Sequence, residues 1–476
     1  QQQALSSNYL DFTSGANDWA QQYLPDLMEK EAEVFGPRTI SGFLSQIGAE
    51  EAMQADQVVW SEQGRLHLSY KGKMTDSTSF LVQADIDGAD SDNNGISNGH
   101  SEIRHGIRVN DTVILADANG VTKCLVTAVS TDDVTVAPYD GSTISALNTN
   151  QTTTILVYGS EFGKGTTYHS AAAADTDQRG ANEPRFKSFT NKPIIIKDYY
   201  EVSGSDTARV GWVEVASESG QSGYLWYLKA EADTRARFTD YLEMAMLEGE
   251  SGNTGGDADV LINGNGNAFG TEGLFAAIAD RGNTTSGVTG VNAATDLAEF
   301  DAILAEFDKQ GAIEENMMFV NRATSLAMDD MLASMNSYGA GGTSYGVFDN
   351  SEDMALNLGF SGFRRGSYDF YKSDFRYLND KATRGSINDA NAAEAIRGVI
   401  IPAGTSTVYD QMLGKNLKRP FLHVRFRASQ TDNRRMKTWV TGSVGAATSA
   451  LDAMQIHMLS ERCLVVQGAN NFMLMK

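Results

Sequence analysis

NKPIIIKDYYEVSGSDTARVGWVEVASESGQSGYLWYLKAEADTRARFTDYLEMAMLEGE (Asn191–Glu250) joins strand-forming sequence directly to a long helical pattern. Its first part holds β-branched and aromatic runs bounded by turn residues, at 193–196, 199–203 and 209–215. Such residues favour the half-buried surface of a pleated sheet. The first part of the stretch therefore predicts strands, in a two-strand pattern that leads directly into the helix.

The second part of this stretch predicts one continuous helix. From Ser222, a residue type that caps helices, to the stop signals Gly249 and Gly252 it has no proline and no internal glycine after Gly223. About 27 helical residues would extend roughly 40 Å, which indicates a helix that spans a flat subunit rather than one layer of an enzyme core. The predicted apolar face holds Leu225, Leu228, Ala232, Tyr241, Leu242 and Ala245, and Lys229, Asp233, Arg237, Asp240 and Glu243 occupy the other faces.

Composition limits the classes of function. The 476 residues carry a formal net charge of −23 and no run of five basic residues, which argues against gripping the phosphates of nucleic acid. The two cysteines, Cys124 and Cys463, do not form a disulfide framework, and a pairing between them stays open. No apolar run approaches the length needed to span a bilayer. The start at Gln1 fits either maturation cleavage or a sequence trimmed to its ordered residues.

The chain before the opening stretch divides into an arm and an insertion. Residues 1–55 hold few strand signals and are interpreted as an arm with short helices, one of them at Pro25–Val34. Strands are predicted at Val58–Trp60 and Arg65–Tyr70. Further short strands with tight turns, at 112–115, 121–129, 134–137 and 155–158, predict a small β-barrel or sandwich inserted at about residues 100–158.

The chain after the long helix alternates between helical and strand patterns. A short strand is predicted at Val260–Ile262. Helices at Asp296–Gln310 and Ala323–Met335 enclose a strand at Met317–Val320, which is an α/β alternation. Later strands are predicted at 367–371, 399–401 and 422–427, and the last residues predict a hairpin of 463–466 with 472–475.

No stretch of the sequence matches a known catalytic or ligand-binding motif in full. His-Glu-x-x-His and Cys-x-x-Cys are both missing from the sequence. Ser344 lies in a Gly-x-Ser-x-Gly string, but its flanks are loop sequence rather than a strand and a helix. Gly159–Lys164 has three residues between its glycines where a phosphate loop has four, and Gly264, Gly266 and Gly270 miss the dinucleotide spacing by one residue.

Two further charged patterns have plain interpretations. Asp90, Asp92 and Asn94 open like a calcium loop, but Ser101 stands where a bidentate Glu is needed, so a solvated hairpin loop is preferred. The arginine pairs 364–365 and 434–435 could bind carboxylates of a neighbouring copy or form a solvated face. The sequence therefore predicts no catalytic, cofactor-binding or metal residues, no cofactor and no enzyme activity.

The order of these parts resembles the major capsid protein of tailed bacteriophages, with its Hong Kong 97-type fold. The resemblance implies an α+β fold made of an N-terminal arm (1–55), an extended β loop carrying the barrel (56–190), a peripheral domain with a spine helix (191–252), an axial domain (253–420) and a return to the peripheral domain (421–476). Some members crosslink a lysine to an asparagine of a neighbour. Lys71 and Lys73 lie in the corresponding region, and the sequence identifies no partner for them.

The resemblance also implies function and partners. The chain would assemble with itself into hexamers and pentamers of an icosahedral head that encloses double-stranded DNA without sequence-specific binding. Portal, scaffolding and decoration proteins would be its other partners, membranes would not, and assembly would take place in the host cytoplasm before the chain becomes part of the virion. The alternatives are a tail or surface-array protein and, less favoured, a serine hydrolase that uses Ser344.

Overall fold

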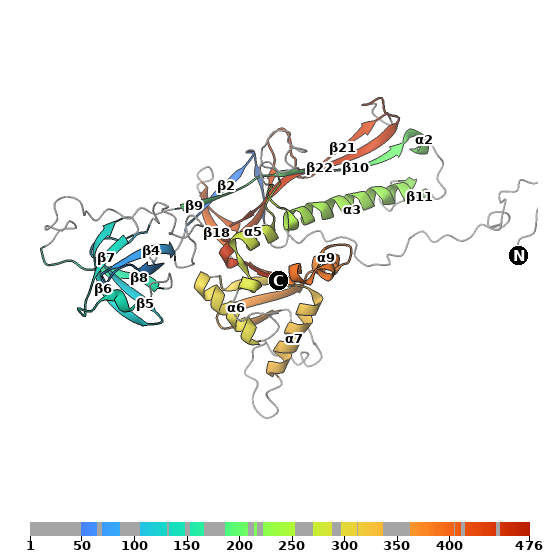
Figure 1. Cartoon of the computed structure of the whole chain (residues 1–476). Coiled ribbons are helices and arrows are strands. Elements are labelled where there is room, and N and C mark those ends of the chain that lie inside the picture. Colours follow the sequence, from blue (N-terminus) through green and yellow to red (C-terminus); the bar gives the residue numbers. More distant parts are fainter. Residues whose placement is uncertain are drawn as a thin grey trace, which may run out of the picture. The chain divides into compact units, whose positions relative to one another are not determined.

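The computed structural model describes residues 49–63, 69–85, 105–130, 133–147, 153–165, 186–207, 214–216, 222–252, 270–287, 297–311, 313–336, 362–403, 405–410, 415–443 and 448–476 (Figure 1). They form a mixed α and β fold in two compact units. One unit contains residues 1–60 and 189–476, and the other contains residues 61–188. The predicted Pro25–Val34 helix and Val260–Ile262 strand lie outside the described residues.

The smaller unit contains a closed six-stranded barrel with the order β3-β4-β7-β6-β5-β8. Its core is apolar, and Phe80, Val113 and Ile155 are completely buried. The barrel extends beyond the predicted 100–158 module, because β3 and β4 close it. Its elements are β3 (Ser69–Met74), β4 (Ser79–Asp85), β5 (Asp111–Asp117), β6 (Gly120–Ser130), β7 (Asp133–Pro138), the 3₁₀ turn η2 (Ile144–Ala146) and β8 (Thr153–Ser160).

A long sheet in the larger unit is built on the 14-residue strand β22 (Ala453–Val466). Along one edge β22 pairs with β10 (Ile194–Ser203), and along the other it pairs with β21 (Lys437–Gly442) and then β20 (Leu422–Arg427), all antiparallel. The edge strand β1 (Ala49–Met53) pairs with β20 in parallel. The predicted strand-forming runs at 193–196 and 199–203 lie in one strand, because Lys197 and Asp198 continue its ladder. The strand β1 lies in residues 1–55, which hold few strand signals, and it was not predicted.

The predicted long helix exists as α3 (Leu225–Glu248), but it begins three residues later than expected. Ser222 is not its N-cap. It belongs to β12 (Ser222–Tyr224), which pairs with β11 (Glu214–Ala216) in a hairpin and so takes these residues out of the helix. The helix ends at Glu248 as predicted. Gly249 follows it at a crowded position, where a Cβ would lie 2.5 Å from the Ala245 carbonyl oxygen and 2.6 Å from that of Thr271.

The buried face of α3 differs from the predicted one. Phe238, Leu242 and Met246 are at most 3% exposed, and the first two pack with Met458 against the sheet. Tyr241, predicted to be buried, is 41% exposed, whereas Glu243, predicted to be exposed, is 9% exposed. The buried face is therefore rotated about the helix axis relative to the predicted apolar face. The apolar pattern did not reveal this, because the buried face carries Thr234 in place of an apolar residue.

A second, six-stranded sheet has the order β13-β23-β17-β14-β16-β15 and helices on both faces. On β14, Met318 and Val320 face α6 and α7, while Phe319 faces α5 and α8 on the opposite side. The predicted helices and strands near 296–335 and 367–401 are confirmed. The elements are α5 (Leu274–Arg281), β13 (Asn283–Thr284), η3 (Thr285–Gly287), α6 (Leu297–Gln310), β14 (Glu315–Val320), α7 (Arg322–Asn336), β15 (Gly362–Arg365), β16 (Tyr368–Asp374), α8 (Arg376–Asn379), α9 (Arg384–Ala390), η5 (Ala392–Glu394), β17 (Gly398–Pro402) and β23 (Met473–Met475).

The predicted C-terminal hairpin is wrong. Residues 463–466 end β22 in the long sheet, whereas β23 pairs with β17 and β13 in the six-stranded sheet. The turn η6 (Ala469–Asn471) redirects the chain, with Gly468 at a positive φ of 61°. Both strands are buried because one apolar cluster, which includes Leu464 and Leu474, joins the two sheets.

Short elements complete the larger unit. The strand β2 (Val58–Gln63) pairs with β9 (Phe186–Asn191), and these strands lie where the chain passes between the units. A hairpin of β18 (Thr405–Asp410) and β19 (Lys415–Pro420) and the short helix α2 (Gly204–Thr207) are the other elements. Among the helices in the described part of the chain, none is long and apolar enough to cross a membrane.

Candidate assembly surfaces

The motifs with possible chemistry do not form a catalytic site in the described residues. Ser344, the Asp90 loop, Gly264 and Gly266 lie outside them. In Gly159–Lys164 the first two residues belong to strand β8 and the next three are coil, which is not the loop of a phosphate site. No group of three or more His, Cys, Asp or Glu side chains that could hold a metal ion occurs among the residues that the structure describes.

The two cysteines are buried free thiols, in different units. Burial raises the pKa of Cys124 to about 11, and nearby Asp140 adds to the shift. Burial also raises the pKa of Cys463 to about 12, against the opposing effect of Arg425. Both groups are therefore protonated and unreactive near neutral pH.

Asn191 fixes the place where the chain returns from the barrel unit. This side chain is 4% exposed, and its Nδ2 donates to the carbonyl oxygens of Leu464 (2.6 Å) and Glu272 (3.1 Å). Its Oδ1 accepts from the Glu272 backbone N–H (2.9 Å) and from Thr271 Oγ1 (3.2 Å). One buried amide thus ties β9, β22 and the residues before α5 together.

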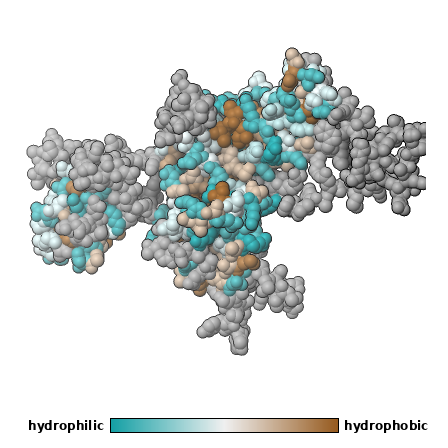
Figure 2. Space-filling model, turned by 45° about the vertical axis from the view of Figure 1, so that its right-hand side comes forward, coloured by the Kyte–Doolittle hydropathy of each residue, from teal (hydrophilic) through white to brown (hydrophobic). Residues whose placement is uncertain are grey.

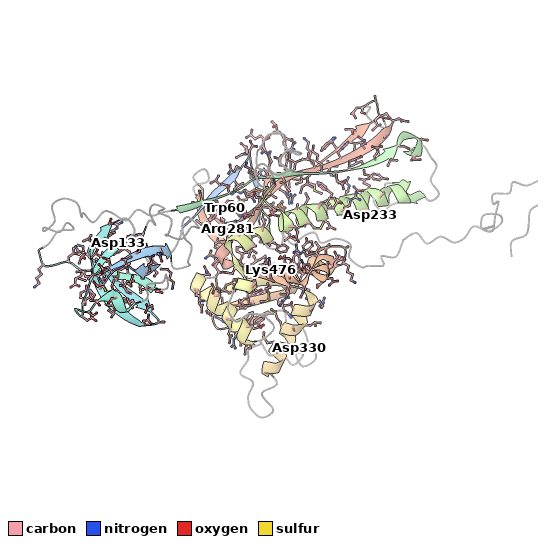
Figure 3. The ribbon with its side chains drawn as sticks, viewed as in Figure 1. Trp60, Asp133, Asp233, Arg281, Asp330 and Lys476 are labelled. Carbon is pink, nitrogen blue, oxygen red and sulfur yellow. The ribbon has the colours of Figure 1, made fainter. Side chains whose placement is uncertain are left out.

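Arg281 forms the second fastening at the same place. Its guanidinium lies 4.6 Å from the centre of the Phe189 ring and 5.6 Å from that of Trp60, and donates to Glu272 at 2.7 Å. Figure 3 shows Trp60 and Arg281 next to each other. Within the larger unit, Trp60 of β2 and Phe189 of β9 are therefore fastened to the end of α5. The sequence analysis did not identify Arg281, because its partners are remote in sequence.

The edge strand β1 is held by an ion-pair network. Glu50 pairs with Arg435, Glu51 pairs with Arg425 at 3.0 Å, and Glu461 pairs with Arg434 at 2.6 Å and with Arg427 at 2.8 Å. Arg427 also pairs with Asp56. The acidic strand therefore matches the basic strand β20 and the turn after it.

The second arginine pair is also bound within the chain. Arg365 makes two 2.8 Å hydrogen bonds to the Asp301 carboxylate, which hold the pKa of that carboxyl below its usual range. Arg364 lies 3.6 Å from Asp369. Both arginines therefore have intrachain carboxylate partners, while the Arg364 side chain stays 64% exposed. A contact of this pair with carboxylates of a neighbouring copy stays a prediction.

The three-stranded part of the long sheet exposes an aromatic row. Tyr199 on β10, His457 on β22 and Trp439 on β21 are directly opposite one another in register. The His457 ring is stacked on both neighbours, at 5.8 Å from Tyr199 and 5.2 Å from Trp439. His457 Nε2 also shares a 2.7 Å hydrogen bond with Thr441 Oγ1. Cross-strand stacking of this kind stiffens a sheet.

The aromatic row lies on the face of the sheet turned away from α3. Alternate residues of β10 point to opposite sides. Ile196 packs on the α3 side with Phe238, and Asp198 pairs with Arg237 of α3 at 3.2 Å. On the other side Tyr199 is 55% exposed and Ile195 is 53% exposed. Large apolar side chains so exposed on a strand are suited to contact another molecule. Sequence alternation showed the strand, and only the pairing register brings the three rings together.

Other apolar side chains are exposed more singly. Leu326 on α7 and Ile387 on α9 are at least half exposed, as is Tyr371 on β16. Figure 2 shows hydrophobic side chains in small groups among mostly hydrophilic ones on the visible face. Scattered residues of this kind are normal for a protein surface. The candidate assembly elements are therefore the aromatic row, strand β1 and the clamp that Arg281 forms with Trp60 and Phe189.

Comparisons with known proteins give a likeness to phage capsids. No protein-family model matches the chain, and no curated protein matches it significantly. A solved structure from Microbacterium phage Oxtober96 has a TM-score of 0.38 and 8% identity, covering 96% of this chain and 97% of that one. The capsid of a native GTA particle has a TM-score of 0.38 and 12% identity, covering 98% and 99%.

A third likeness covers less of the chain. The capsid asymmetric unit of cyanophage Pam1 has a TM-score of 0.34 and 11% identity, covering 65% of this chain and 82% of that one. The GTA and cyanophage Pam1 structures are both named as capsids, the class of protein that the sequence resembles. Scores this low give no correspondence between individual residues.

Proposed function

We propose that the chain is a phage major capsid protein that assembles with itself into hexamers and pentamers of a closed icosahedral head. The observation that carries the proposal is the Tyr199–His457–Trp439 row on a sheet whose opposite face is covered by α3. One face of the sheet is used inside the subunit, and the other presents aromatic and apolar side chains. Such a surface suits contact with a second copy.

The internal packing gives this surface a stiff support. The helix α3 has 24 residues, about 36 Å of length, and lies along β10 and β22. The ion pair between Arg237 and Asp198 and the buried Phe238 fix it to the sheet. In our proposal this assembly is the spine of the subunit, and its stiffness lets many small interfaces add together in one lattice.

The insertion and the first strand supply overlapping elements. Residues 56–190 would be an extended loop that carries the barrel and is fastened by Arg281 and Asn191 at its root. Residues 1–55 would be an N-terminal arm whose last part is β1. Residues 191–252 and 421–476 would form the peripheral domain and residues 253–420 the axial domain. This division gives the proposed Hong Kong 97-type arrangement.

The negative net charge of the chain supports a shell that encloses DNA without binding it tightly. A chain with a net charge of −23 repels the phosphates of packaged double-stranded DNA, so the shell would hold the genome without sequence-specific contacts. Portal, scaffolding and decoration proteins are the further partners in this proposal. Assembly would take place in the host cytoplasm, and no enzymatic step of the chain itself is part of it.

The experiment that tests the proposed interface replaces the aromatic side chain at the β21 end of the row. Trp439→Ala should leave the subunit folded, because the ring is only partly buried, and should reduce the yield of large particles in sedimentation through a sucrose gradient. Tyr371→Ala is the matched control, since Tyr371 is 53% exposed on the other sheet. Equal particle yields from the two variants would exclude the aromatic row as an assembly contact.

A further inference from the structure

The barrel unit has a depression of about 570 Å³ on its outer surface, away from its apolar core. It lies across β5, β6 and β8 and the residue that follows β7, and is lined by Thr112, Lys123, Tyr139, Tyr158 and the segment 159–161. Its lining is mostly apolar with a few polar groups. This volume lies in the range of small-molecule sites, although the depression is open to solvent.

The floor of the depression contains a buried hydroxyl without a partner. Thr112 alternates with the core residues Val113 and Leu115, so it faces the outside of the barrel, yet it is only 5% exposed. Its Oγ1 has no hydrogen-bond partner among the described residues. An unpaired buried hydroxyl is unfavourable, and a bound ligand able to donate or accept a hydrogen bond would remove that cost.

A glycine leaves this hydroxyl uncovered. Gly159 is directly opposite Thr112 in the ladder, and a Cβ placed on it would lie 3.3 Å from Thr112 Oγ1. No positive φ requires glycine at this position. Any other residue would therefore shield the floor of the depression, and the glycine keeps it open.

The walls of the depression are two tyrosine rings. Tyr139 is 50% exposed and Tyr158 is 49% exposed, so each ring presents part of its surface to solvent. The hydroxyl of Tyr139 donates to Glu161 Oε2 at 2.5 Å, which fixes the orientation of that ring. A ligand would therefore meet a preoriented aromatic wall and would not have to order it.

The rim carries one cation and one anion. Lys123 has no ion pair with any described residue, and Glu161 keeps one carboxylate oxygen beyond its bond to Tyr139. A phosphate-bearing ligand would find a single lysine offset by a carboxylate. An alkyl chain would leave the buried Thr112 hydroxyl unpaired.

From these features we propose that the barrel binds a neutral saccharide of one or two rings. A sugar ring has an apolar C–H face, which suits the two tyrosines, and hydroxyls that both donate and accept. Those hydroxyls would accept from Lys123, donate to Glu161 and pair with the Thr112 hydroxyl on the floor. The shallow shape predicts dissociation constants near the millimolar range. This activity goes beyond shell formation and does not depend on it.

The test is saturation-transfer NMR on the full-length chain with maltose, lactose and diacetylchitobiose. Sorbitol, which has hydroxyls but no ring face, is the matched control compound. At least one of the three sugars should give a difference signal and sorbitol should give none. Absence of signal for all three sugars, or an equal signal for sorbitol, would overturn the proposal.

Variants locate the binding. Tyr158→Ala should weaken binding about tenfold and Thr112→Val about fivefold, since they remove the wall and the floor hydroxyl respectively. Gly159→Ala should weaken binding while every pocket side chain stays in place. Tyr371→Ala, an equally exposed tyrosine in the other unit, should bind as the unchanged chain does. Sugar signals that persist in both Tyr158→Ala and Thr112→Val would contradict the assignment.

Discussion

Proline at Ala236 should break the continuity of α3 without unfolding the subunit. The residue lies midway along the 24-residue helix. Proline there removes the hydrogen bond to the Ala232 carbonyl and clashes with it, at a cost of about 3 kcal/mol or more. The residues after it, Phe238, Leu242 and Met246, are each at most 3% exposed. Burial of such side chains contributes about 1.5–3 kcal/mol each, so together they outweigh the proline.

The second half of the helix is also anchored at its end. Glu248 accepts a 2.8 Å hydrogen bond from the Tyr377 hydroxyl and pairs with Arg384 at 2.6 Å. Burial, followed by the bond to Glu248, raises the pKa of Tyr377. The proline should therefore release the first half of α3, up to residue 235, while the second half stays packed.

Hydrogen exchange and electron microscopy measure the two consequences. Ala236→Pro should give soluble protein whose amides at 225–235 exchange faster and whose assemblies are open or aberrant. Ala236→Ser is the matched control, because serine costs only about 0.5 kcal/mol in a helix and keeps every backbone hydrogen bond. Unchanged exchange and closed particles from Ala236→Pro would refute the role of α3 as a spine.

Three further changes test other parts of the molecule. Arg281→Met should lower local stability by about 1–3 kcal/mol and speed proteolysis at β2 and β9. Arg235→Met, which removes an exposed ion pair within α3, should not. Equal cleavage of the two variants would show that Arg281 does not hold these strands. Both cysteines should resist iodoacetamide at pH 8 in the folded chain, and rapid labelling at that pH would contradict their burial. Because folding raises both thiol pKa values above the ordinary 9.0, their contribution to the free energy of unfolding is complete below about pH 9 and falls as the pH rises further. Replacing Ser61–Ser188 by a short linker should leave the larger unit folded, as measured by circular dichroism. Deleting Gly99–Tyr158 should instead cause aggregation, because it leaves β3 and β4 without their partner strands in the barrel. A soluble, folded product of this smaller deletion would show that β3 and β4 do not need the closed barrel.

The sequence predicted elements where local pattern and burial agree. The apolar spacing of α6, with Phe300, Ile303 and Phe307 buried on one face, gave that helix correctly. Strand β20 was predicted with its observed bounds. In these segments the periodicity of the apolar residues matches the side that the core covers, so no long-range information is needed.

The errors arise where pairing partners are remote in sequence. Residues 463–466 and 472–475 are both strand-forming and close together, yet they enter different sheets, because residues 463–466 pair with β20 and residues 473–475 pair with β17. Strand β1 has the sequence AEEAM and no strand pattern, and arginines nearly 400 residues away complete it. The same remoteness concealed the aromatic row, the Arg281 clamp and the depression on the barrel.

Negative-stain electron microscopy of the purified full-length chain tests the central claim most directly. A protein that forms the proposed lattice should give closed isometric shells, whose projection averages show pentamers at the vertices and hexamers between them. The alternative of a tail or surface-array protein predicts tubes or flat sheets instead. Tubes, sheets or exclusively unassembled chains, at concentrations and salt conditions that keep the protein folded, would contradict the account.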